Sequence, residues 1–225
     1  AEPADLAERW ELNLDAVADV APGAEASAMM AEVLAGPNIA SRRWIYRQYD
    51  HMVRIGTVAR PGDADAAVIR LPEGKRGIAL TVDCNPRLCW LDPYRGAAMA
   101  IAECCRNLAC VGAEPLGTTD CLNFGNPERP EIMWEFVESI RGLGDACRAF
   151  DAPVVSGNVS LYNETGDTAV KPTPSVAVVG RVEDVERVAQ TAFVREGLEI
   201  ALLGRLEGEG GASLAGSAYL QDQHG

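Results

Sequence analysis

Stretches typical of β-strands alternate with stretches typical of α-helices through the middle of the chain. The runs 66–71 and 78–83 are apolar, and the Pro72-Glu73-Gly74 turn between them predicts a β-hairpin. Helices are then expected over 96–111 and 130–150, and strands over 116–122, 153–157 and 175–182. Such alternation favours an α/β (α+β) fold, in which helices pack on a sheet.

The two ends of the chain follow a different pattern. Apolar residues at helical spacing predict two short helices within 5–34, broken at Pro22-Gly23, and Ser41 is expected to cap a further turn or helix. At the other end a strand is expected over 198–204. The Gly-rich stretch 208–216 follows, for which a flexible loop is a better interpretation than a phosphate-binding helix start. A further domain is expected to begin here, so we expect the chain to be a piece of a longer protein.

Composition and charge limit the class of protein. With 225 residues, of which 48% are hydrophobic, the chain can bury the core of one large domain or two small ones. A net charge of -13 without a marked cluster of Lys and Arg argues against nucleic-acid binding. No apolar run is long enough to span a membrane, and the first residues lack a basic and apolar leader, so a cytoplasmic protein is expected. The seven cysteines include no C-x-x-C pair and are expected to be buried, reduced thiols.

Small, polar and acidic residues are concentrated in two segments that follow predicted strands, namely 118–128 and 156–164. Ligands of open α/β sheets bind at such strand ends, so both segments are candidate site loops. Asp120 could bind a nucleotide hydroxyl or a metal, and Gly157 would let the backbone approach a ligand. Asn158 could give Mg²⁺ a carbonyl oxygen, and Ser160 could donate to a phosphate. The same residue types also favour tight turns, so both interpretations stay open.

A second candidate metal site lies on the helix predicted over 96–111. Glu103 and Asn107 are four residues apart, so a carboxylate and an amide oxygen share one face of this helix. Asp65 or Asp83 from the hairpin would strengthen the site if either converged on that face. A helix face with one acid is more often simply solvated. The chain contains no Walker A loop, dinucleotide fingerprint, nucleophile elbow or zincin helix, and spacing suggests no catalytic partner for His51.

Several long stretches resemble one enzyme family, in the right order, namely residues 37–44, 46–51, 91–96, 120–128 and 156–165. They resemble the second half of the small-type, PurL-like large subunit of phosphoribosylformylglycinamidine synthase, also called formylglycinamide ribonucleotide amidotransferase. The likeness spans nearly the whole chain, which makes it far more specific than a single short motif. Selenophosphate synthetase and thiamine-phosphate kinase belong to the same superfamily and also use ATP and Mg²⁺, but the segment 121–128 speaks against them.

The resemblance implies an aminoimidazole-ribonucleotide-synthetase-like fold with a mixed sheet and flanking helices. Residues 1–38 would be a helical linker from the preceding half, and residues 39–190 the second copy of the N-terminal α/β domain. Residues 191–225 would be the truncated beginning of the C-terminal α/β domain. Two N-terminal units pair through their sheets in this superfamily, so an isolated fragment is expected to self-associate through its sheet or to become partly disordered.

The reaction implied by the resemblance converts formylglycinamide ribonucleotide, glutamine-derived ammonia and ATP to formylglycinamidine ribonucleotide, ADP and phosphate in de novo purine biosynthesis. Its cofactors would be ATP and Mg²⁺. By position, Asp120 and Gly157 match ATP-contacting residues, Asn158 a Mg²⁺ ligand and Ser160 a substrate contact. Glu103, Asn107 and Asp65 resemble metal-site positions of larger relatives.

The family's catalytic histidine lies in the other half, so no catalytic residue is expected in this chain and the fragment alone should be inactive. A glutaminase subunit and a small bridging subunit are the implied protein partners. The alternative is a non-catalytic half-domain that binds nucleotide and acts as a scaffold, or another ATP-using member of the superfamily.

Overall fold

A computed structural model of the chain describes residues 1–11, 23–201, 203 and 216–224. The chain divides into two compact units. The first contains Ala1–Glu11 and Arg42–Gln190, and the second contains Leu12–Ser41 and Thr191–Gly225. The second unit includes helices α1 (Ala24–Ala35) and α6 (Ala218–His224), which contact each other. All candidate site residues belong to the first unit.

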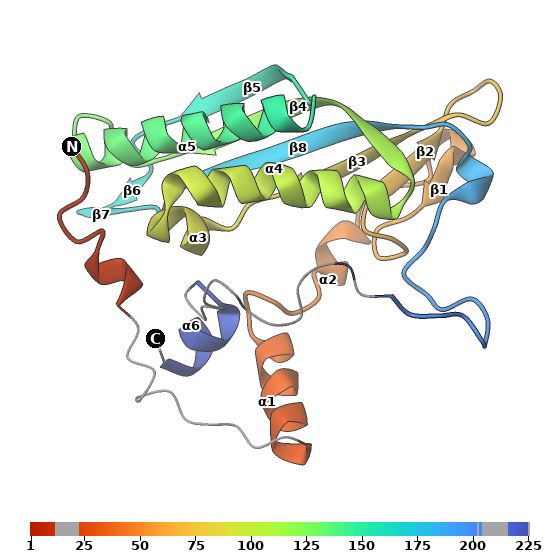
Figure 1. Ribbon diagram of the computed structural model, residues 1–225, viewed down its shortest axis with the longest axis horizontal. Coiled ribbons are helices and arrows are strands. Elements are labelled where there is room, and N and C mark those ends of the chain that lie inside the picture. Colours follow the sequence, from red (N-terminus) through yellow and green to blue (C-terminus); the bar gives the residue numbers. More distant parts are fainter. Residues whose placement is uncertain (12–22, 202, 204–215, 225) are drawn as a thin grey trace. The chain divides into compact units, whose positions relative to one another are not determined.

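A six-stranded mixed sheet forms the centre of the first unit (Figure 1). Its strands, in spatial order, are β1 (Thr57–Ala59), β2 (Ala67–Arg70), β3 (Gly77–Asp83), β8 (Thr173–Val182), β4 (Ala113–Asn123) and β5 (Val154–Ser160). Neighbouring strands are antiparallel except for β4 and β5, which are parallel. Strands β6 (Glu164–Thr165) and β7 (Thr168–Ala169) form a separate small hairpin. Strand β5 is therefore an edge strand of the main sheet.

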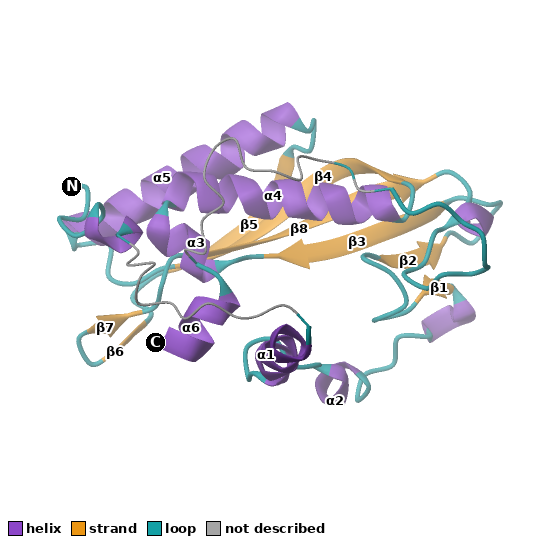
Figure 2. Cartoon of the chain, turned by 60° about the horizontal axis from the view of Figure 1, so that its bottom comes forward, coloured by secondary structure: helices purple, strands orange, loops and turns teal. Residues whose placement is uncertain are grey.

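Three helices of this unit pack beside the sheet: α3 (Pro86–Leu91), α4 (Pro93–Cys110) and α5 (Pro130–Ala149) (Figures 1 and 2). Each begins with proline, which lacks the N–H that a first helical turn leaves unpaired. Gly142 lets α5 approach α4 closely, because a Cβ atom there would lie 2.0 Å from the Tyr94 carbonyl oxygen. Gly112, with φ of 76°, follows the end of α4.

Burial alternates along β8 and shows which face of the sheet the helices cover. Val176, Val178 and Val182 are buried in the core, whereas the residues between them are partly exposed. We call the buried side, which faces α4 and α5, the covered face, and the opposite side the open face. Apolar side chains on the open face include Ile69, Leu80 and Val82, which stay exposed.

The N-terminal segment is tied to the helices through Arg9, which lies in the short 3₁₀ helix Glu8–Trp10. Its Nη1 donates to the Glu135 carboxylate at 2.9 Å and to the Trp90 carbonyl oxygen at 2.7 Å. The guanidinium also lies 4.5 Å from the centre of the Trp90 ring. Burial raises the pKa of Glu135, and the Arg9 guanidinium opposes this rise. Arg9 therefore favours the charged form of the buried Glu135 carboxylate.

The predicted hairpin, both long helices and the strand near 175–182 are confirmed by β2, β3, α4, α5 and β8. The predicted strand over 198–204 is wrong for the described residues 198–201 and 203, which have no regular structure. Ile200 and Leu203 are largely exposed there, since an apolar run becomes a strand only when another strand pairs with it. The short helix α2 (Arg43–Tyr46) starts after Arg42, so Ser41 is not its N-cap.

Residues 12–22 and most of the stretch 208–216 lie outside the described residues, as does part of the first helix predicted within 5–34. Within the described part of the chain, no helix is long and apolar enough to cross a membrane.

Candidate site at the β4–β5 pair

The residues predicted to form two site loops lie on two neighbouring parallel strands. Asp120 of β4 pairs with Gly157 of β5, Cys121 pairs with Asn158, and Asn123 pairs with Ser160. Asn158 and Ser160, which were expected to lie beyond a strand ending at residue 157, are therefore part of β5, whereas residues 124–128 and 161–163 lie in loops as expected. Backbone pairing with β4 extends β5 through small polar residues that carry no β-type pattern of their own. The pairing of β4 with β5 places the two segments side by side.

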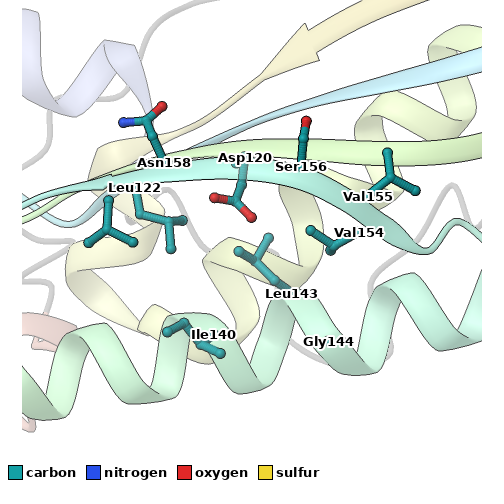
Figure 3. Close-up of a pocket in the computed structure, with 11 residues that line it drawn as sticks. Asp120, Leu122, Ile140, Leu143, Gly144, Val154, Val155, Ser156 and Asn158 are labelled. Carbon is teal, nitrogen blue, oxygen red and sulfur yellow. The ribbon is translucent and has the colours of Figure 1, made fainter.

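The sheet separates the four predicted site residues into two pairs. Paired residues on adjacent strands point to the same face, and successive residues point to opposite faces. Asp120 pairs with the buried Val176 as well as with Gly157, so both lie on the covered face. Asn158 and Ser160 lie on the open face. Figure 3 shows the Asp120 carboxylate directed towards α5 and the Asn158 amide directed away from it.

A groove of about 610 Å³ lies between β5 and α5 on the covered face (Figure 3). Its lining is mostly apolar and contains Asp120, Leu122, Ile140, Leu143, Gly144, Val154, Val155, Ser156, Gly157, Asn158 and Val159. Burial raises the pKa of Asp120 above its usual value. A Cβ atom on Gly157 would lie 2.3 Å from Oδ1 of Asp120, so only glycine leaves room for the carboxylate. The groove thus combines apolar walls with an acceptor that a nucleoside could use.

The open face of the same strands carries short polar side chains. Ser156 Oγ donates to Thr119 Oγ1 at 2.7 Å, and Asn158 lies exposed beside Cys121. Near the carboxyl end of β5, Ser160 Oγ donates to Asn163 Oδ1 at 3.2 Å. Neutral oxygens predominate here, so this surface can offer an amide or hydroxyl oxygen to a cation or a ligand hydroxyl.

The sequence matches the family described as AIR synthase related protein, N-terminal domain, over residues 63–182, which is more than half of the chain. The chain belongs to this family. The matched residues contain β3, β4, β5 and β8, so this AIR-synthase-related domain holds the whole site described above. The predicted synthetase-like fold, with its mixed sheet and flanking helices, is confirmed.

Curated relatives point to one member of the family, as the sequence resemblance predicted. The chain is 58% identical over 207 residues to the phosphoribosylformylglycinamidine synthase subunit PurL of Anaeromyxobacter sp. (strain K), covering 90% of this chain and 27% of the relative. It is 51% identical over 224 residues to the PurL subunit of Thermomicrobium roseum, covering 100% of this chain and 30% of the relative. The chain thus spans less than a third of the length of these relatives.

Solved structures agree with this likeness. The structure of PurLQS from Thermotoga maritima matches with a TM-score of 0.62 and 36% identity, covering 67% of this chain and 25% of that chain. T. maritima PurL complexed with ATP, and the same protein complexed with FGAR, each match with a TM-score of 0.59. Their identities to this chain are 34% and 36%, and each match covers 67% of it and 24% of the other chain.

The residues of the second predicted metal site are partly brought together in this AIR-synthase-related domain, because Asp83 lies near enough to Glu103 for the two carboxylates to interact. Asn107 Nδ2 donates to Thr81 Oγ1 at 3.3 Å, and Glu103 pairs with Arg106. Asp83 lies at the end of β3, where burial and then the Glu103 carboxylate raise its pKa. Among the described residues, no three His, Cys, Asp or Glu side chains are grouped so that they could hold a metal ion.

The cysteine and histidine predictions meet different outcomes. All seven cysteines are free, and Cys89, Cys104, Cys105 and Cys147 are buried, as expected. Burial was wrongly predicted for Cys110 and Cys121, which are exposed. His51 is exposed and its Nδ1 lies 3.2 Å from the Tyr49 carbonyl oxygen.

Sequence reasoning assigned no role to Tyr162 and Asn163, two and three positions after the predicted substrate contact Ser160. Tyr162 has φ of 60°, a left-handed conformation that is uncommon for a non-glycine residue, and Asn163 hydrogen-bonds to Ser160. The sequence gives no signal for either feature, because both depend on the loop after β4.

Proposed function

We propose that this chain is part of an ATP-dependent carbon–nitrogen ligase that makes formylglycinamidine ribonucleotide from formylglycinamide ribonucleotide, ammonia and ATP, a step in purine biosynthesis. The observation that carries the proposal is the β4–β5 pair, which places all four predicted site residues on two adjacent strands in a chain 58% identical to a PurL subunit. Homologous T. maritima PurL has been captured with ATP and with FGAR, which supports the two ligand classes.

The covered face supplies the nucleotide contacts in this proposal. Asp120 accepts hydrogen bonds from the nucleoside in the apolar groove, and Gly157 keeps the space beside that carboxylate free. Asp120 and Gly157 lie on one face of the sheet, and Asn158 and Ser160 on the other. An ATP molecule that contacts both faces must therefore extend around the free edge of β5. Because β5 has no strand beyond it in the main sheet, this edge offers backbone groups to a ligand.

The open face supplies the contacts to Mg²⁺ and to the ribonucleotide. Among the described residues this surface has no grouped carboxylates, so the Asn158 amide oxygen fits Mg²⁺ only as one ligand of an ion that phosphate oxygens also hold. When bound, Mg²⁺ neutralises triphosphate charge during phosphoryl transfer. Ser160 contacts the ribonucleotide and fixes it beside the nucleotide.

The chemistry requires an activated amide. An amide is a poor electrophile, so transfer of the γ-phosphoryl group to its oxygen creates a leaving group, after which ammonia attacks the carbon and phosphate departs. This chain binds and orients the reactants, which is worth several orders of magnitude in rate when the reacting atoms are held in contact. The catalytic histidine, the glutaminase subunit and the small bridging subunit come from outside the chain in this proposal.

The open face also provides a surface for pairing with another AIR-synthase-related domain. Its apolar half contains Ile69, Leu80 and Val82, with exposed fractions of 45%, 39% and 71%. Covering such a surface contributes about 25 cal/mol for each Å² removed from water. The isolated chain is therefore expected to self-associate through this half of the open face, with the other half of a longer synthase as its partner in the complete protein.

The test uses the complete synthase polypeptide with an ammonium salt as nitrogen source. Ser160→Ala and Asn158→Ala should lower kcat/KM by about tenfold or more with an unchanged melting temperature, because each removes one polar ligand contact. The control is Glu114→Gln, which alters an exposed residue at the opposite end of β4 and should leave kcat/KM unchanged. Full activity in both Asn158→Ala and Ser160→Ala would contradict the proposal.

A scaffolding half-domain that holds nucleotide without contributing to turnover is the second candidate. It is favoured by the absence of a metal-binding carboxylate group among the described residues. In that case the same substitutions lower thermal stability or nucleotide affinity and leave kcat unchanged.

A further inference from the structure

The loops that follow β4 and β5 are joined by a set of hydrogen bonds around Ser160. Phe124 N–H donates to the Ser160 carbonyl oxygen at 3.0 Å, and Asn163 N–H donates to the Phe124 carbonyl oxygen at 3.1 Å. Tyr162 N–H donates to the Gly125 carbonyl oxygen at 2.9 Å. These bonds hold Tyr162 at φ of 60°, so the position of the next residue, Asn163, is determined by both loops.

The side chain of Asn163 has a single orientation that satisfies its partners. Its Nδ2 lies 3.0 Å from the Phe124 carbonyl oxygen and 2.9 Å from the Ser160 carbonyl oxygen. Both partners are acceptors, so the donor end of the amide must face them, and the opposite end must be the oxygen. That oxygen, Oδ1, lies 3.2 Å from Ser160 Oγ.

The state of the Ser160 hydroxyl follows from this orientation. Asn163 Oδ1 can only accept a hydrogen bond, so the Ser160 proton is directed towards it. The Ser160 oxygen then has lone pairs but no proton to offer a ligand. A phosphate oxygen, which needs a donor, gains nothing from this group, whereas a hydroxyl or an amide N–H can donate to it.

We propose that Asn163 is a positioning residue that makes Ser160 a hydrogen-bond acceptor, selective for a ribose hydroxyl or amide N–H of the substrate rather than its phosphate. The inference rests on the proposed function, in which Ser160 contacts the ribonucleotide. It replaces the expectation that Ser160 donates to a phosphate.

The experiment separates the acceptor and donor ends of the Asn163 amide in the complete synthase, by measuring the KM for formylglycinamide ribonucleotide, the KM for ATP and the melting temperature. Asn163→Ala removes both ends, so the ribonucleotide KM should rise about three- to tenfold while the ATP KM stays within about twofold. Asn163→Asp keeps an acceptor for Ser160 but loses both donor bonds. Its melting temperature should fall, and its ribonucleotide KM should stay within about twofold of the original.

A double substitution tests whether Asn163 acts through Ser160. Ser160→Ala with Asn163→Ala should raise the ribonucleotide KM no further than the worse single substitution, because both remove the same contact. The matched control is Asn126→Ala, which removes an acceptor for Glu128 N–H at 2.8 Å in the loop after β4 and should lower stability without changing either KM.

Three results would overturn the inference. The first is an unchanged ribonucleotide KM in Asn163→Ala. The second is an equal increase in the ribonucleotide KM in Asn163→Ala and Asn163→Asp. The third is a double substitution whose increase in KM is the product of the two single increases. If Ser160→Ala alone leaves both KM and kcat unchanged, the proposed role of Ser160 fails together with the inference. If Ser160→Ala raises KM and Asn163→Ala does not, only the inference fails.

Discussion

The covered and open faces of the main sheet are made by alternate residues of the same strands, yet they differ in packing and in chemistry. On β8, Val178 of the covered face is fully buried, whereas its neighbours Ala177 and Val179 on the open face are partly exposed. The predicted ligand residues are divided in the same way, with Asp120 on one face and Asn158 on the other. The comparison teaches that adjacent residues in a strand can serve two different surfaces.

The largest expected effect comes from placing a charge on each face. Val178→Asp should cost about 4 kcal/mol or more, and could prevent folding, because it buries an unpaired carboxylate in the core. Val82→Asp, at a position 71% exposed on the open face, should change the free energy of unfolding by about 0.5 kcal/mol or less. Urea denaturation measures both variants. Light scattering of the isolated chain should show weaker self-association for Val82→Asp, and similar losses of stability in both variants would contradict the distinction between the faces.

Replacing a glycine of the groove on the covered face with alanine adds one methyl group and so tests how closely the groove is packed. Gly157→Ala should cost about 1–3 kcal/mol and weaken nucleotide binding, since its Cβ would overlap the Asp120 carboxylate. Gly144→Ala is the matched control in the same groove, because its Cβ would be 3.5 Å from Arg148 Nη1, an ordinary contact. The control should gain up to about 1 kcal/mol from helix propensity. Thermal denaturation with and without ATP distinguishes the two, and equal behaviour would mean that Gly157 is not confined by Asp120.

The pH dependence of stability should have opposite signs for two aspartates. Burial raises the pKa of Asp120 above its usual 3.8, so the protonated carboxyl stabilises the folded state relative to the charged one. This contribution to the free energy of unfolding is present below the unfolded-state pKa and is lost as pH rises through the folded-state pKa. Asp120→Asn should therefore melt at a higher temperature than the original chain at pH 7, and the difference should shrink towards pH 4. Thermal melts across this range provide the measurement.

Asp145 is the control for that experiment. Hydrogen bonds from Tyr94 and then from Arg148 lower its pKa, so its contribution is present above the unfolded-state pKa and is lost as pH falls. Asp145→Asn should melt at a lower temperature than the original chain at pH 7, and again the difference should shrink under acid. The same sign for both variants would show that burial does not govern Asp120.

The smallest expected effect compares a buried serine with an exposed one. Ser139 on α5 is fully buried, and its Oγ has no hydrogen-bond partner among the described residues. Ser139→Ala should be neutral or stabilising by up to about 1 kcal/mol, because it removes an unsatisfied hydroxyl and improves helix propensity. Ser156→Ala on the open face should cost about 0.5 kcal/mol through loss of the bond to Thr119. Chemical denaturation measures the free energy of unfolding of both variants. A clear destabilisation in Ser139→Ala would point to a partner for that hydroxyl.

Local patterns predicted much of the fold because strong periodicity coincides with burial. The apolar alternation of β2 and β3 and the amphipathic stretch of α4 each carry enough apolar surface to specify their own type of structure. The polar part of β5 could not be predicted in this way. Its residues are exposed, and it is a strand because its backbone pairs with β4.

By itself, the sequence determined the family and the order of the main elements, and it predicted the four candidate site residues, because side-chain types and spacing are local properties. Only the tertiary structure decided that Asp120 and Gly157 lie on the face opposite Asn158 and Ser160, and that Asn163 orients Ser160. The physical reason is register: hydrogen bonds between strands distant in sequence fix which side chains share a face, and a shift of one residue would reverse every assignment.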